Sequence, residues 1–120
     1  MIFGRSRKAI GDDAENKACD YLKKHRLKIL ERNFRSRNGE IDIIASDKQS
    51  IIFIEVKFRQ NNSHGEPFES VTALKQQKII KTALYYLQTH PKYNEMNCRF
   101  DVISIYQNNI QWLKNAFEAN

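Results

Sequence analysis

The chain has 120 residues, which is enough for one domain with one hydrophobic core and too few for two. About 41% of the residues are hydrophobic and 28% are charged, a balance that excludes disordered and fibrous classes. The net charge of +6 is compatible with a phosphate-bearing partner, and also with many proteins that bind no nucleic acid. No apolar run reaches membrane-spanning length and no signal-peptide segment follows the basic N-terminus, so we expect a cytoplasmic protein without a membrane partner.

The predicted elements follow a flexible basic arm at residues 1–9, and residues 10–120 form a single domain. The order αβββαββ predicts an α/β fold, with α+β as the alternative, in which helices flank a mixed β-sheet. Helical spacing begins near residue 10, and the later elements are strands at 27–34, 39–45 and 51–58, a helix from about 70 or 72 to 88, and strands at 99–106 and 110–113.

The two β-rich runs at 39–45 and 51–58 are joined by a short polar segment and read as an antiparallel hairpin. The second run is apolar on both faces at its start, so we expect it to be central and covered on both sides. Strict alternation along the first run places Ile41 and Ile43 on one face and Glu40 and Asp42 on the other.

A hairpin closing symmetrically about residues 48 and 49 places Asp42 opposite Glu55, and Glu40 opposite Lys57. Directly opposite side chains have Cβ atoms about 4.5–5.5 Å apart. Two carboxylates at so short a distance repel one another unless a positive charge lies between them. Mg²⁺ is a hard cation that prefers such oxygen ligands. The alternative left open by the residues alone is ordinary surface pairing of glutamate with lysine on an edge hairpin.

Several further residues bear on this site. Glu15 borders the buried stripe of the first helix, where a metal, a basic residue or backbone amides would have to satisfy its charge. Asp101 is expected to pair with a nearby base rather than with a metal. Cys19 and Cys98 are expected to be buried free thiols, with a disulfide as the alternative, and the three histidines form no zinc pattern.

Several motifs together are recognisable: Gly11-Asp12-Asp13-Ala14-Glu15, Asn33-Phe34-Arg35, Gly39-Glu40-Ile41-Asp42-Ile43-Ile44-Ala45, Phe53-Ile54-Glu55-Val56-Lys57 with Arg59, Lys75, and Arg99-Phe100-Asp101-Val102. From about residue 10 to 117 the chain resembles the YraN family, a compact branch of the PD-(D/E)XK nucleases similar to archaeal Holliday-junction resolvases. The resemblance implies a restriction-endonuclease-like fold. The chain departs from the family's sequence pattern in two places: Ile41 stands where a proline is common, and His25-Arg26 stands where a glycine is expected.

The resemblance implies roles for individual residues of this chain. Asp42 and Glu55 match the metal-binding carboxylates, with the Val56 carbonyl as a further ligand of one Mg²⁺ or Mn²⁺, and Lys57 matches the catalytic lysine that orients the attacking water. Glu15 resembles an additional acid of the site, and Glu40 is an accessory metal ligand. Either acid is a candidate for recruiting a second ion, so one-metal and two-metal sites both stay open. Contacts with the DNA backbone are expected from basic residues, chief among them Arg35, Arg37, Arg59, Lys75 and Lys78.

The sequence therefore predicts a Mg²⁺-dependent endonuclease that acts on DNA, with branched and single-stranded forms both open. A non-catalytic nucleic-acid-binding or assembly module on a nuclease scaffold is the alternative from another class. A phosphodiesterase acting on RNA or nucleotides is a third reading of the same site. Nothing in the pattern fixes the oligomeric state, and a homodimer stays open.

Overall fold

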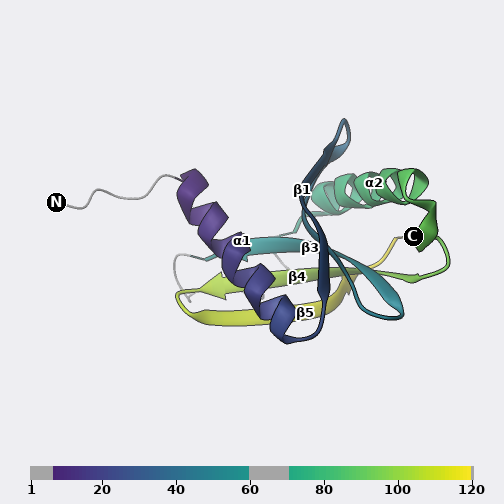
Figure 1. The fold of residues 1–120 in the computed structure, drawn as a ribbon. Helices are drawn as coiled ribbons and strands as arrows, with labels where there is room; N and C mark the ends of the chain where they lie inside the picture. The colour runs from purple at the N-terminus through teal and green to yellow at the C-terminus, as the bar shows by residue number, and fades with distance from the viewer. Residues whose placement is uncertain (1–6, 60–70, 120) are drawn as a thin grey trace.

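The β-rich runs of the sequence become the strands of one mixed sheet in the computed structural model, which describes residues 7–59 and 71–119. The strand order across the sheet is β1-β2-β3-β4-β5, and only the β3–β4 pair is parallel. The predicted α/β class and the order αβββαββ are confirmed (Figure 1). The elements are α1 (Arg7–Lys24), β1 (Lys28–Ser36), β2 (Gly39–Ser46), β3 (Ser50–Phe58), α2 (Ala73–Thr89), the short 3-10 helix η2 (Pro91–Tyr93), β4 (Asn97–Tyr106) and β5 (Asn109–Phe117).

Strand β3 is the centre of the sheet and is covered on both faces, as its apolar start predicts. Ile52 and Ile54 pack in the core beneath α1, whereas Ile51 and Phe53 pack in the core beneath α2. All four side chains are essentially fully buried. The helices therefore hold β3 from opposite sides and fix the direction in which each of its side chains points.

The hairpin register is also confirmed. The β2–β3 pairs run from Ile43 with Ile54 to Ser46 with Ile51, which is the symmetrical closure predicted about residues 48 and 49. One step beyond the Ile43–Ile54 pair, the same register places Asp42 opposite Glu55. Two apolar runs joined by a short polar connector were enough to set this geometry.

The alternation predicted along β2 is wrong at Ile41. Ile43 packs in the α1 core, but Ile41 packs with Ile44 in the α2 core. The β1–β2 hairpin bends out of the sheet and passes α2 (Figure 1), and at Gly39 it comes so close that an added Cβ would lie 3.4 Å from the Cβ of Lys78. This twist turns the outer end of β2 toward α2, so a strict two-residue period fails there.

The start of α1, the end of β5 and one burial differ from expectation. Helix α1 begins at Arg7, inside the expected basic arm, while residues 1–6 lie outside the described part of the chain. Helix α2 begins after Thr72, whose hydroxyl accepts the N–H of Lys75 as an N-cap, and β5 continues to residue 117. Both cysteines are free thiols as predicted, but Cys98 is exposed. Neither described helix has the length and apolar character needed to span a bilayer.

Candidate metal centre

The two predicted carboxylates meet where the β2–β3 ladder ends. Asp42 is half-buried, and its Oδ2 accepts a hydrogen bond from the backbone N–H of Val56 at 2.8 Å. A side chain of β2 thus receives the N–H from β3 just past the Ile43–Ile54 pair. The same contact ties Asp42 to the residue between Glu55 and Lys57, so the sheet itself orients the carboxylate.

Glu55 is the most deeply buried acid of the site, with 5% of its surface exposed. Its Oε2 contacts the ammonium of Lys75 on α2 and lies 3.7 Å from Nζ of Lys57. Lys57 points to the same face of β3, two residues further along the strand. Two ammonium groups from different elements therefore surround one buried carboxylate.

The electrostatics show that Asp42 and Glu55 share a proton. Burial, together with the hydrogen bond to Glu55 and its charge, raises the pKa of Asp42 to about 9. Burial alone would raise the pKa of Glu55 as well, but the hydrogen bond with Asp42 and the ammonium of Lys75 outweigh it and hold that pKa below its ordinary value. The pair accordingly favours keeping one proton, and Asp42 is the carboxyl that resists ionisation.

The two lysines are affected in opposite directions. Burial and the adjacent Lys75 ammonium lower the pKa of Lys57. Burial also acts to lower the pKa of Lys75, but its hydrogen bond and charge interaction with Glu55 raise it overall. Lys75 is therefore the firmly charged partner of Glu55, and Lys57 is the lysine more easily deprotonated.

Glu15 approaches the pair from α1 but is held by β1. Its Oε1 accepts a hydrogen bond from Nδ2 of Asn33 at 2.9 Å and lies 3.5 Å from a guanidinium nitrogen of Arg32. Its charge contributes to the raised pKa of Asp42, which places it near the site. Of the alternatives open for Glu15, the structure shows a basic residue, Arg32, and the side-chain amide of Asn33 adds a contact that was not predicted.

Glu40 contacts an arginine of β1 instead of the Asp42–Glu55 pair. Its Oε2 lies 3.3 Å from Nε of Arg35 on the neighbouring strand. Over residues 7–59 and 71–119, no group of three or more acidic, histidine or cysteine side chains is gathered closely enough to hold a metal ion. The acid donors that the structure brings together are thus the two carboxylates of Asp42 and Glu55.

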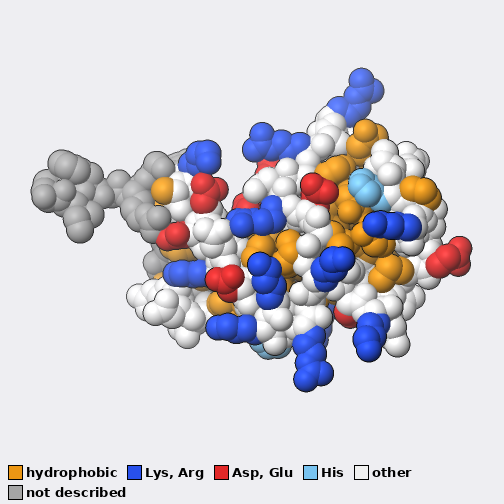
Figure 2. Space-filling model, in the orientation of Figure 1, with side chains coloured by type: hydrophobic (Ala, Val, Ile, Leu, Met, Phe, Trp, Pro, Cys, Tyr) orange, Lys and Arg blue, Asp and Glu red, His pale blue; other side chains and the backbone are white. Residues whose placement is uncertain are grey.

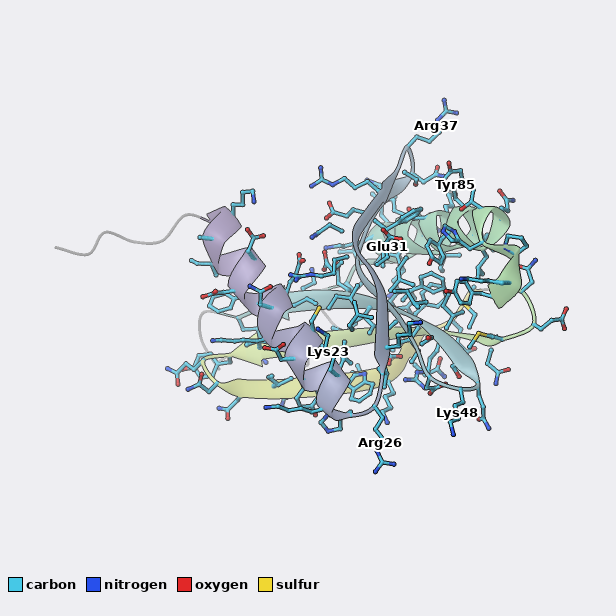
Figure 3. The ribbon with its side chains drawn as sticks, viewed as in Figure 1. Lys23, Arg26, Glu31, Arg37, Lys48 and Tyr85 are labelled. Atoms are coloured by element: carbon cyan, nitrogen blue, oxygen red, sulfur yellow. The ribbon has the colours of Figure 1, made fainter. Side chains whose placement is uncertain are left out.

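Apart from Lys75, which contacts Glu55, the predicted DNA-contacting residues fall into two groups. Arg35 and Arg37 lie on the β1–β2 hairpin, with Arg37 at the tip that projects from the body (Figure 3), and Lys78 packs beside that hairpin at Gly39. Arg59 instead lines a pocket of about 330 Å³ with residues of β4 and β5. Figure 2 shows Lys and Arg side chains spread over the face that α1 and the hairpin present.

Sequence reasoning missed two contacts of this centre. It assigned Lys75 to phosphate binding and did not place its ammonium on Glu55. It also gave Asn33 no role, although an asparagine inside a strand is unfavourable unless it adopts a special conformation. Asn33 has a φ of 53°, in the left-handed region that asparagine tolerates, and this local turn accompanies the bond from its amide to Glu15.

Comparison with known proteins places the chain in a family. Residues 14–105 match the family described as "Uncharacterised protein family UPF0102". A UPF0102 protein of Coxiella burnetii is 46% identical over 119 residues, covering 98% of each chain. A UPF0102 protein of Francisella tularensis subsp. novicida is 48% identical over 109 residues, covering 90% of this chain and 93% of its own. These matches agree with the motifs that resemble YraN proteins, and the chain belongs to the UPF0102 (YraN) family.

Proposed function

We propose that this chain is a Mg²⁺-dependent endonuclease that hydrolyses phosphodiester bonds in DNA and has a restriction-endonuclease-like fold. One observation carries the proposal: the carboxyl groups of Asp42 and Glu55 lie close together on adjacent strands, with the ammonium groups of Lys57 and Lys75 beside Glu55. Burying two neighbouring carboxyl groups destabilises the folded state. The same two groups are suitable ligands for a hard cation.

The donor chemistry fits Mg²⁺ or Mn²⁺. Mg²⁺ is commonly held by one or two carboxylates together with several waters and substrate phosphate oxygens, so a complete cage of protein ligands is not required. Asp42 and Glu55 supply the two carboxylates, and the carbonyl of Val56, whose N–H already binds Asp42, is the proposed third ligand. Occupancy by a divalent cation would replace the shared proton and remove the repulsion between the two acids.

The residues around this pair supply the remaining chemistry. When bound, the cation supplies Lewis acidity toward the scissile phosphate. Lys57 orients the attacking water, and its lowered pKa makes it a better proton acceptor than an ordinary lysine. Lys75, firmly charged, neutralises negative charge on a phosphate oxygen once its contact with Glu55 is released.

Glu15 and Glu40 have subordinate roles in this proposal. Glu15 stays anchored by Arg32 and Asn33 and acts through its charge on Asp42. Glu40 becomes an accessory ligand only if its contact with Arg35 opens. The arginines and lysines of the hairpin and α2 contact the DNA backbone, which predicts salt-dependent and largely sequence-independent affinity.

The test is a cleavage assay on labelled junctions, flaps, duplexes, single strands and RNA, each with Mg²⁺, Mn²⁺ or EDTA. We expect metal-dependent cutting of DNA by the natural chain and a loss of about 100-fold or more in Glu55→Gln. Glu95→Gln, an exposed glutamate near η2, is the matched control and keeps full activity. Undiminished cutting by Glu55→Gln would refute the assignment.

A non-catalytic nucleic-acid-binding or assembly module is the second candidate. The observation that favours it is the Lys75 contact, because an ammonium already compensates Glu55 and a metal is not needed for charge balance. The same assay separates the two functions: DNA binding without cleavage under every metal condition favours the module. Cleavage of RNA alone would instead support the phosphodiesterase reading.

A further inference from the structure

An exposed aromatic ring lies next to the arginine-bearing hairpin. Tyr85 on α2 has 45% of its surface exposed. One side of its ring is supported by Phe34 of β1, with ring centroids 6.2 Å apart and planes 29° from parallel. In Figure 3 Tyr85 lies on α2 beside the hairpin whose tip carries Arg37. The ring is thus held in place while part of it faces solvent.

Tyr85 also lines a pocket of about 460 Å³ with residues of the hairpin turn, Arg35, Ser36, Arg37 and Asn38. This volume lies in the range of small-ligand sites. Two guanidinium groups and an aromatic face on the rim of one hollow are the elements by which proteins hold unpaired bases: the base stacks and the arginines attract its phosphates. A smooth duplex offers no base face to such a pocket.

The pocket is aligned with the metal centre along α2. Lys75, Lys78, Thr82 and Tyr85 follow the three- and four-residue spacing that places side chains on one edge of a helix. That edge borders the hairpin, because Lys78 lies under Gly39 and the hydroxyl of Thr82 contacts that of Ser36. Lys75 and Tyr85 are ten residues apart, or about 15 Å along the helix axis.

We propose that Tyr85 and the hairpin turn form a stacking site for an unpaired nucleotide of the DNA strand that enters the metal centre. The inference rests on the proposed nuclease function and names its substrate class as DNA with single-stranded character near the cut. The spacing of Lys75 and Tyr85 along α2 places the held base a few nucleotides from the scissile phosphate. Arg37, on the rim of the pocket, attracts the phosphate of the held nucleotide, and Lys78, between Lys75 and Tyr85 on α2, binds the intervening backbone.

The test is fluorescence anisotropy of labelled oligodeoxythymidine and of a blunt duplex of equal length, both in EDTA. Tyr85→Ala should weaken single-strand binding by about 5- to 100-fold and leave duplex binding within about twofold. Tyr85→Phe should bind as the natural chain does, because the phenyl ring still stacks. Leu84→Ala, an adjacent side chain that is 54% exposed on another side of α2, is the matched control and should bind unchanged.

A second readout reports stacking directly. In Tyr85→Trp, single-stranded DNA should quench the added tryptophan fluorescence, and the duplex should not. Single-strand binding that is unchanged in Tyr85→Ala, or that falls equally with duplex binding, overturns the stacking site. Since EDTA prevents cleavage, the outcome is independent of the nuclease proposal: selective loss in Tyr85→Ala with no cleavage by the natural chain refutes only the nuclease, and cleavage with unchanged Tyr85→Ala binding refutes only the stacking site.

Discussion

Two acidic centres lie on neighbouring strands of the sheet, and they satisfy their buried carboxylates in opposite ways. Asp101 on β4 pairs in register with Ile54, the residue before Glu55, and has no exposed surface. Its two oxygens accept hydrogen bonds from the guanidinium of Arg99, from Nε1 of Trp112 and from the N–H of Asn115. Both carboxylate oxygens of Asp101 thus have hydrogen-bond donors, so this acid stabilises the junction of β4 and β5, as a structural role predicts.

The Asp42–Glu55 centre lacks that balance. Its two acids face each other, one is forced to keep a proton, and the compensating charges come from two lysines that also repel each other. The comparison teaches that burial of an acid does not by itself indicate a function. A carboxylate surrounded by donors stabilises the fold, whereas a pair of carboxylates held together against repulsion indicates a site kept for a ligand.

The largest effect that would test this contrast is on stability. Asp101→Ala leaves the Arg99 charge and the Trp112 N–H without their partner in a buried place, and we expect it to lower the free energy of unfolding by about 3–5 kcal/mol. Asp101→Asn keeps part of the hydrogen bonding and should lose less. Urea denaturation followed by circular dichroism measures both. A loss below about 1 kcal/mol in Asp101→Ala would remove the structural half of the comparison.

Asp42→Asn should raise the free energy of unfolding, whereas Asp101→Ala lowers it. An ordinary aspartate has a pKa near 3.8, but folding raises that of Asp42 to about 9, so the folded chain keeps a proton that the unfolded chain releases. Stability contributed by this group is complete below about pH 4 and falls as the pH rises toward 9. Asparagine does not titrate, so the variant should be more stable than the natural chain at pH 7 by at least about 1 kcal/mol.

The pH series supplies the control for Asp42→Asn. The difference between the two unfolding free energies should be small near pH 4 and should widen up to about pH 9. Calorimetric titration with Mn²⁺ should show that the variant has lost metal binding while it gained stability. A variant that is less stable than the natural chain throughout this range would show that the carboxylate is satisfied, as Asp101 is.

The sequence predicted the parts of this centre that depend on local pattern. The β-rich runs around residues 42 and 55, with a short polar connector between them, set the strands and their register, and the register sets the acid pair. The structural role of Asp101 was also predictable, since a base two residues away on the same face of a strand is in reach.

What the sequence did not predict depends on how distant elements are placed. The Lys75 contact requires α2 to lie over the end of β3, and no local pattern fixes that position. The failure of alternation at Ile41 comes from the twist of the β1–β2 hairpin, and the exposure of Tyr85 depends on where that hairpin passes the helix. The resemblance to YraN proteins pointed to Lys75 as a basic residue of the site, but only the assembled fold shows which acid it meets.

The smallest effect concerns the lysine that now compensates Glu55. Lys75→Met removes a positive charge from the place that a cation would approach, so we expect Mn²⁺ to bind roughly five- to tenfold more tightly, the effect of one charge a few ångströms away in a partly hydrated site. Lys81→Met, on the outer side of α2, is the matched control. Arg99→Met removes the corresponding charge beside Asp101 and should cost stability without any gain in metal affinity, because the N–H groups of Trp112 and Asn115 still occupy the oxygens of Asp101. Weaker Mn²⁺ binding in Lys75→Met would mean that the ammonium supports the metal instead of competing with it, and the two acidic centres would then differ less than their contacts indicate.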